Sequence, residues 1–282
     1  MKKILLPTDF SEVATNALQM AVHIARKSGA ELHLLHVEES VNNTDFNTMG
    51  DTAGDTSGMD KLYMLKLLEM NKKKMLELVD TINDENFKVF HAVDVGQMFR
   101  SVRLYVAEQG IDLVVMGTHG ASGISEVLIG SNTEKVVRQV GCPVLSVRHL
   151  PAELGVGKIV FATNFEGDQT RVIEQLKQMQ ALFGAHLHLV YVNTVFSFTS
   201  SRTIRERMAG FVKKHNLTDY EFSVYNDETE ERGIIHFADE VDADIIAVAT
   251  HGRTGLAHLL LGSVSEGVVN HSQRPVLTFH LS

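Results

Sequence analysis

Val114-Val115-Met116-Gly117-Thr118-His119-Gly120 is an aliphatic run that ends in Thr-His-Gly, and Gly130-Ser131 follows after nine residues. This pattern is the strongest indication of the fold. The same pattern returns as Ile246-Ala247-Val248-Ala249-Thr250-His251-Gly252 and then Gly262-Ser263. A repeat period of about half the 282-residue chain predicts two homologous domains, over residues 1–149 and 155–282. The copies differ at one informative position, Gly117 against Ala249, so the two halves need not share one function.

Short β-rich runs alternate with longer helical patterns in both halves. We expect strands at residues 4–7, 32–37, 89–93, 113–116, 144–147, 159–162, 187–192, 222–225, 245–248 and 276–279. Strands that alternate with helices indicate a mainly parallel sheet covered on both faces. The predicted fold class is therefore α/β, with two tandem doubly wound domains of five strands each. Residues 39–58, rich in Asn, Thr, Gly and Asp, are expected to form a surface loop.

Composition and charge exclude several classes of protein. The net charge is −9 and neither half is basic, which argues against nucleic acid as a partner. No apolar run approaches the roughly 20 residues that span a bilayer, so we expect no membrane partner. The opening residues are interrupted by Pro7 and Asp9, so no signal peptide is expected. A single cysteine, Cys142, allows no internal disulfide and fits a reducing cytoplasm; we expect a buried thiol rather than a nucleophile.

A candidate ligand crevice lies where predicted strands end. Asp9, Val37 and the Gly117 loop all fall at carboxyl ends of strands, where α/β sheets bind ligands. Glycines at 117, 120 and 130 allow positive φ and a close approach of an anion to backbone N–H groups, and Ser131 adds a hydroxyl donor at a helix start. Glycine spacing alone leaves two interpretations open, phosphate binding and an ordinary Gly-rich turn before a Ser cap.

Two motifs together resemble those of the universal stress protein family. They are Ile4-Leu5-Leu6-Pro7-Thr8-Asp9-Phe10-Ser11 and Gly117-x2-Gly120-x9-Gly130-Ser131, and the resemblance covers nearly the whole chain as a tandem of two domains. It implies a Rossmann-like fold of the adenine nucleotide alpha hydrolase type and ATP, AMP or ADP as the ligand, with or without Mg²⁺. The nucleotide-binding residues that it implies are Pro7, Thr8, Asp9, Val37, Met116, Gly117, His119, Gly120, Gly130, Ser131 and Asn132. Within this set Asp9 and Val37 would meet the adenine, and the glycine loop the ribose and phosphates.

The second half departs from this pattern at two positions. Asn164 stands where Asp9 stands, which keeps a carbonyl acceptor but loses the charge. Ala249 replaces Gly117, which adds a Cβ where a ligand would approach and penalises positive φ. The alternative is that Ala249 has ordinary strand dihedrals and changes nothing. We expect a weaker second site formed by Asn164, Val192, Gly252, Gly262 and Ser263.

The chain's fourteen histidines raise the question of a metal site. The strand pairs His33 with His36 and His186 with His188 are expected to scatter across sheet faces, and no His-x3-His or Cys-rich zinc spacing is present. We therefore expect no metal held by the protein alone. His119 and His251, at equivalent loop positions, either bond a phosphate or cap a turn.

The resulting hypothesis is a cytoplasmic stress-response protein that binds an adenine nucleotide in its first half and acts as a sensor or regulator. No Gly-x4-Gly-Lys-Ser/Thr loop is present, so any ATP hydrolysis is expected to be slow and no catalytic residue is named. A scaffold without nucleotide, a binder of a small apolar ligand and a slow ATP hydrolase are the alternatives. The resemblance also implies that the two halves pair within the chain through residues 144–147 and 276–279. Whether a second chain adds to give a homodimer is left open. The stress signal and the downstream partner are not encoded in any motif.

Overall fold

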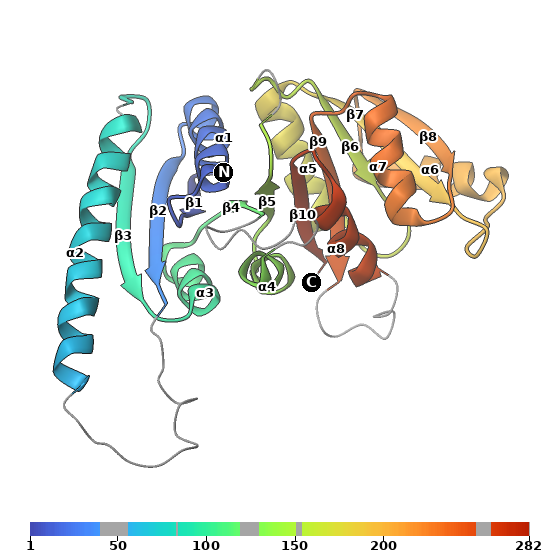
Figure 1. Cartoon of the computed structure of the whole chain (residues 1–282). Coiled ribbons are helices and arrows are strands. Elements are labelled where there is room, and N and C mark those ends of the chain that lie inside the picture. Colours follow the sequence, from blue (N-terminus) through green and yellow to red (C-terminus); the bar gives the residue numbers. More distant parts are fainter. Residues whose placement is uncertain (40–55, 83, 119–129, 151–153, 252–260, 282) are drawn as a thin grey trace, which may run out of the picture.

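The computed structural model describes residues 1–39, 56–82, 84–118, 130–150, 154–251 and 261–281 (Figure 1). The first half contains β1 (Lys3–Pro7), α1 (Glu12–Ser28), β2 (Glu31–Glu38), α2 (Thr56–Ile82), β3 (Val89–Val95), α3 (Met98–Gln109), β4 (Leu113–Gly117), α4 (Ser131–Gln139) and β5 (Val144–Val147). The second half contains β6 (Lys158–Ala162), α5 (Thr170–Phe183), β7 (His186–Asn193), α6 (Ser201–His215), β8 (Tyr220–Asn226), α7 (Glu230–Glu240), β9 (Ile245–His251), α8 (Leu261–His271) and β10 (Val276–Leu281).

The strands form one ten-stranded sheet in the order β3-β2-β1-β4-β5-β10-β9-β6-β7-β8. Pairing within each half is parallel, which confirms the predicted α/β class with five strands per half. The two sheets join edge to edge through β5 and β10, the strands that the family resemblance implied would pair. Most of the expected 39–58 loop lies outside the described residues, and its end was placed too late, because α2 begins at Thr56.

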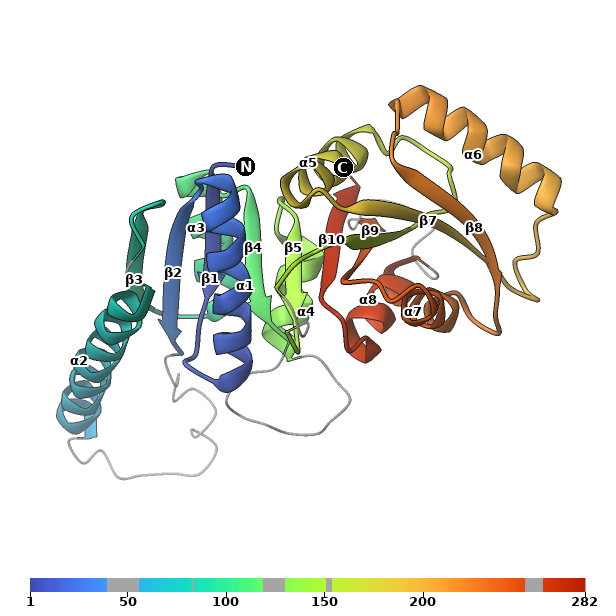
Figure 2. The same ribbon diagram turned by 90° about the horizontal axis from the view of Figure 1, so that it is seen from above.

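The strand order places one reversal in each half. The chain runs outward from β1 to β3 and then returns to form β4 on the other side of β1. The connections that leave the carboxyl ends of the adjacent strands β1 and β4 therefore run to opposite sides, and α1 and α4, which follow them, lie on opposite faces of the sheet (Figure 2). β6 and β9 repeat this arrangement in the second half.

The junction between the halves is an antiparallel pair of strands. Leu145 of β5 lies opposite Leu277 of β10, and the Thr278 hydroxyl donates to the Val144 carbonyl at 3.1 Å. On the face covered by α1 and α5, buried residues of both halves form a single hydrophobic cluster, whereas the opposite face has one cluster per half. The halves thus share part of their core.

The environment of the single cysteine and the character of the helices bear on two sequence-based expectations. Cys142 is buried, and burial raises the pKa of its thiol to about 12, so the thiol stays protonated and unreactive at neutral pH. Within the described part of the chain, every helix is too short or too polar to cross a bilayer.

Candidate functional site

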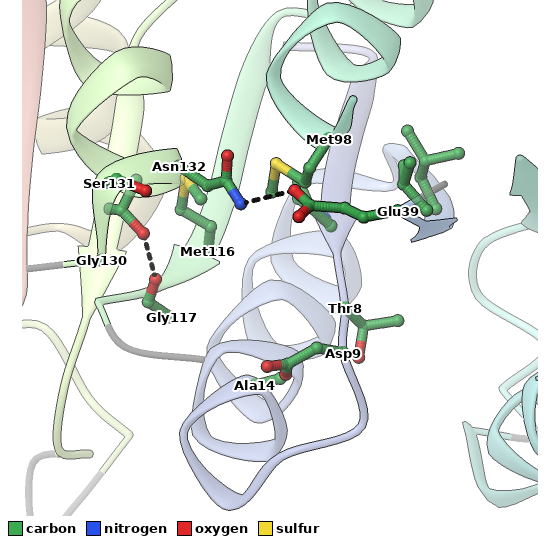
Figure 3. Close-up of a pocket in the computed structure, with 14 residues that line it drawn as sticks. Thr8, Asp9, Ala14, Glu39, Met98, Met116, Gly117, Gly130, Ser131 and Asn132 are labelled. Atoms are coloured by element: carbon green, nitrogen blue, oxygen red, sulfur yellow. Dashed lines mark hydrogen bonds between the residues drawn. The ribbon is translucent and has the colours of Figure 1, made fainter. Parts of the chain in front are cut away.

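A pocket of about 280 Å³ opens at the carboxyl ends of β1, β2 and β4, beside the start of α4 (Figure 3). The described residues that line it are Pro7, Thr8, Asp9, Ala14, Leu35, Val37, Glu39, Met98, Met116, Gly117, Gly130, Ser131, Asn132 and Thr133. Nine of the eleven site residues expected in the first half are in this set. The other two, His119 and Gly120, lie outside the described residues.

The turn after β1 is held by hydrogen bonds that use most polar atoms of Thr8. Its amide donates to the Leu35 carbonyl at 2.9 Å, its hydroxyl accepts from the Phe10 amide, and its carbonyl lies 2.8 Å from Nδ1 of His36. Phe10 has φ of 63°, and its ring packs on His36. The turn leaves Asp9 at the pocket, where Oδ1 accepts from the Ser11 amide at 3.0 Å. Thr8 therefore shapes the site, and Asp9 offers the carboxylate.

The start of α4 presents main-chain donors to the same pocket. Gly130 is the N-cap and provides no side-chain acceptor, so the first N–H groups of the helix lack a side-chain cap. Thr133 fixes this turn against the sheet, because its hydroxyl donates to the Gly117 carbonyl at 3.0 Å. Uncapped N–H groups at the positive end of a helix dipole form an arrangement that suits an anion.

The glycines at the pocket have a different purpose from the one expected. Gly117 and Gly130 do not have positive φ, and Gly130 has φ of −59°. A Cβ on Gly117 would lie 3.0 Å from Cγ1 of Val13 and 3.2 Å from the Val13 carbonyl carbon. The prediction that Gly117 supplies positive φ is therefore wrong. Glycine suits position 117 because α1 crosses β4 so closely that a Cβ would be crowded.

Sequence reasoning missed five lining residues, of which Glu39 matters most. Its Oε1 accepts from Nδ2 of Asn132 at 3.1 Å, so a carboxylate reaches across the pocket to the start of α4 (Figure 3). Side chains alternate between the two faces of a strand, so Leu35, Val37 and Glu39 belong to one face. That period could have identified Leu35 and Glu39 once Val37 was chosen. The described lining includes the carboxylates of Asp9 and Glu39 and no Lys, Arg or His side chain.

Comparison with known proteins now identifies the family. The model of the universal stress protein family matches residues 1–148 and again residues 155–280. The chain belongs to the universal stress protein family. The resemblance noted from the two sequence motifs is thereby confirmed.

Three relatives illustrate the relationship. A universal stress protein of Methanocaldococcus jannaschii is 34% identical over 153 residues, which cover 52% of this chain and 94% of the relative. A tandem one of Synechocystis is 24% identical and aligns with 99% of this chain and 100% of the relative. The crystal structure of a universal stress protein from Archaeoglobus fulgidus covers 99% of this chain and 98% of its own, with a TM-score of 0.77 and 21% identity, which shows the shared fold.

The second half of this universal stress protein repeats the turn after the first strand, but its pocket differs from the first in volume and lining. Phe165 has φ of 61°, its amide donates to the Thr163 hydroxyl, and Asn164 Oδ1 accepts from the Glu166 amide at 3.1 Å, as Asp9 does from Ser11. Asn164, Val192 and Ala249 line a larger pocket of about 570 Å³. Ala249 lies in β9 without positive φ, as the alternative interpretation expected, whereas the effect of its Cβ on a ligand stays a prediction. Gly252 lies outside the described residues, and Gly262 and Ser263 fall in the first turn of α8.

Two exposed aromatic rings stand at the second pocket, whose lining also includes the charged side chains of Glu166, Arg207 and Glu230. Phe196 and Phe198, on the segment between β7 and α6, are 96% and 75% exposed and line the pocket. Thr194, the counterpart of Glu39, is buried and hydrogen-bonds with the Ser197 hydroxyl at 2.8 Å. The second pocket thus lacks the carboxylate that crosses the first.

Proposed function

We propose that this universal stress protein is a cytoplasmic regulator that binds an adenine nucleotide in the pocket of its first half. The observation that carries the proposal is the convergence of nine expected residues from β1, β2, β4 and α4 on one pocket, beside a helix start without a side-chain cap. The volume of about 280 Å³ is near the lower end of ligand pockets, roughly 300–1,000 Å³, and suits the adenosine part. The phosphates would extend over the first turn of α4.

The described lining carries two carboxylates and no cationic side chain, so the phosphates would be held by main-chain N–H groups with the help of Mg²⁺. Asp9 and Glu39 repel a polyphosphate, and the donors of the described lining at the start of α4 are main-chain N–H groups and the side chains of Ser131 and Asn132. A divalent cation between carboxylates and phosphates would remove that repulsion. Affinity for ATP is therefore expected to rise with Mg²⁺.

The same lining favours binding over fast catalysis. Phosphoryl transfer uses positively charged groups at the γ-phosphate and a group that orients the nucleophile. The described residues of the pocket include no cationic side chain. We infer that ATP turnover is slow and that the bound nucleotide acts as a signal.

Titration calorimetry with MgATP tests the binding site. We expect micromolar affinity for the wild type and a loss of at least about tenfold for Asp9→Ala, since a hydrogen bond to a charged group contributes roughly 1.5–3 kcal/mol. Asn164→Ala is the matched control in the second half, where the same turn is present, and should change affinity less than twofold. Absence of binding at millimolar ATP, or equal losses in both variants, would refute the proposal.

A second candidate function concerns the other pocket. Its volume of about 570 Å³ and the exposed Phe196 and Phe198 favour a small apolar ligand. Native mass spectrometry of the purified protein should then find an apolar ligand that is lost in Phe196→Ser, a change that leaves the fold intact because this ring contacts mainly water. A wild-type spectrum with no such ligand, or a ligand retained by Phe196→Ser, would remove this candidate.

A further inference from the structure

Two histidines and a glutamate meet at the amino-terminal ends of β7 and β8, far along the strands from the second pocket. His186 and His188 are two residues apart on β7 and therefore share one face of the sheet, where their ring centroids are 4.9 Å apart. Glu221 lies opposite His188 in the register of β7 and β8, and its Oε2 is 3.7 Å from Nδ1 of His188. The expectation that this histidine pair scatters across faces is wrong, because its spacing matches the strand period of two.

The three side chains form a compact set of donor atoms. One ring nitrogen from each histidine and one carboxylate oxygen of Glu221 all lie within 4.8 Å of one another. Nε2 of His186 and Nε2 of His188 are both shielded from water and have no hydrogen-bond partner among the described residues. His188 is only 8% exposed, so its unmatched nitrogen is a cost to the fold that a ligand would offset.

Asp219 completes the arrangement without joining the donor set. Its Oδ1 lies 2.7 Å from Nδ1 of His186, which orients the ring and leaves Nε2 as the free donor atom. A carboxylate behind a histidine is the usual support of a metal-binding imidazole in proteins.

We propose that His186, His188 and Glu221 bind a divalent transition-metal ion such as zinc. Two imidazoles and a carboxylate suit that class of metal, and three protein ligands leave one coordination position open to water. Donor atoms around zinc lie about 3.4 Å apart, so separations of up to 4.8 Å must contract by as much as about 1.4 Å. Glu221 can supply this movement because its side chain is largely exposed. The ion would join β8, the outermost strand, to β7 (Figure 2).

The surroundings are compatible with a cation. Lys158 is in register with His186, but its Nζ donates to the Val241 carbonyl at 2.8 Å, which holds the ammonium group in another interaction. Phe237 provides an apolar wall beside His188.

The first half contains the same frame without the donor set. His33 is the counterpart of His188, but Phe90 replaces Glu221 and stacks on the imidazole at 4.8 Å. Tyr105 replaces Phe237, and its hydroxyl lies 3.0 Å from Nδ1 of His33. Glu31 replaces His186. These residues satisfy one nitrogen of His33 within the protein, so the first half is an internal control.

Zinc titration of the untagged, chelator-treated chain tests the proposal. We expect one Zn²⁺ per chain at this site, a loss of affinity of about 10-fold to 100-fold in Asp219→Asn, and larger losses in Glu221→Gln and His186→Gln. Glu31→Gln, the counterpart substitution in the first half, should leave the affinity unchanged. Glu221 is exposed, so Glu221→Gln is expected to fold normally, which circular dichroism verifies.

Cobalt provides a direct view of the coordination. Co²⁺ bound to two nitrogens, one carboxylate oxygen and water should give the visible absorption of a tetrahedral ion, and Glu221→Gln should abolish that band. Binding that survives both Glu221→Gln and His186→Gln, or that falls equally in Glu31→Gln, overturns the assignment. So does a wild-type chain that takes up no zinc.

Discussion

Thr8 in the first half and Thr163 in the second begin nearly identical turns, yet the pockets beyond those turns differ in volume, charge and rim. In both turns, the threonine hydroxyl accepts a hydrogen bond from the main-chain amide of the phenylalanine two residues later, and that phenylalanine has positive φ. The first pocket is crossed by Glu39 and holds Asp9, while the second is about twice as large and edged by exposed phenylalanines. The comparison teaches that backbone hydrogen bonds preserve the frame, whereas a few lining side chains set the ligand chemistry.

The largest effect is expected from exchanging the residue at the end of β4. Gly117→Ala places a Cβ against Val13 and should lower the free energy of unfolding by about 1–3 kcal/mol, the usual cost of overpacking. Ala249→Gly, the reverse exchange, should cost only about 0.5–1 kcal/mol. Urea unfolding measures both. Equal losses would mean that α1 does not restrict β4 as the structure indicates.

Smaller and similar losses of stability are expected in the two halves where α4 and α8 are hydrogen-bonded to the sheet. Thr133 Oγ1 donates to the Gly117 carbonyl and Ser265 Oγ to the Ala249 carbonyl, at 3.0 and 3.1 Å. Thr133→Val and Ser265→Ala each remove one such hydrogen bond, at a cost of about 0.5–1.5 kcal/mol. Thermal or urea unfolding should show similar losses in both. A loss confined to one half would break the idea of a common frame.

The carboxylate of Glu39 distinguishes the pockets functionally. Glu39→Ala should raise affinity for ATP about fivefold, or about 1 kcal/mol, when Mg²⁺ is absent, because a competitor for Asn132 and a repulsive charge are removed. Saturating Mg²⁺ should shrink the gain. Thr194→Ala is the control in the second half and should leave ATP affinity as it is. A decrease in the affinity of Glu39→Ala for ATP would mean instead that Glu39 contacts the nucleotide favourably.

Acid should destabilise the protein gradually, through buried or partly buried histidines of both halves. Burial is the main cause that lowers the pKa of His23 and His33 in the first half and of His215 and His280 in the second. A histidine whose folded pKa is lowered leaves the unfolded chain with more bound protons below about pH 6.5, so stability falls as pH decreases through that value. Urea midpoints in chelator should therefore drop between pH 7.5 and pH 5.5. Unchanged midpoints, or a rise, would contradict this sign.

Several features of this protein could be predicted because they depend on local order. The repeat, the alternation of strands and helices and the position of Asp9, Val37 and the Gly117 loop at strand ends are properties of a linear pattern. Their convergence on one pocket followed because parallel strands bring their carboxyl ends to the same edge of a sheet.

Other features depend on contacts between residues distant in sequence. The close approach of Val13 is the physical reason for Gly117, and no spacing in the chain reveals it. Glu39 reaches Asn132 across 93 positions, and Glu221 reaches His188 only because β7 and β8 pair in one register.

Hydrophobic periodicity and strand-to-helix connections are encoded residue by residue, so they were sufficient to predict the two α/β halves, their strand content and the edge of the sheet where a ligand would bind. The family resemblance of the motifs added the pairing of the two last strands. The folded chain was needed to show that the halves share part of one core, that a carboxylate crosses the first pocket, and that two histidines and a glutamate gather on β7 and β8. Those outcomes depend on strand register and side-chain packing, which are fixed only when distant segments meet.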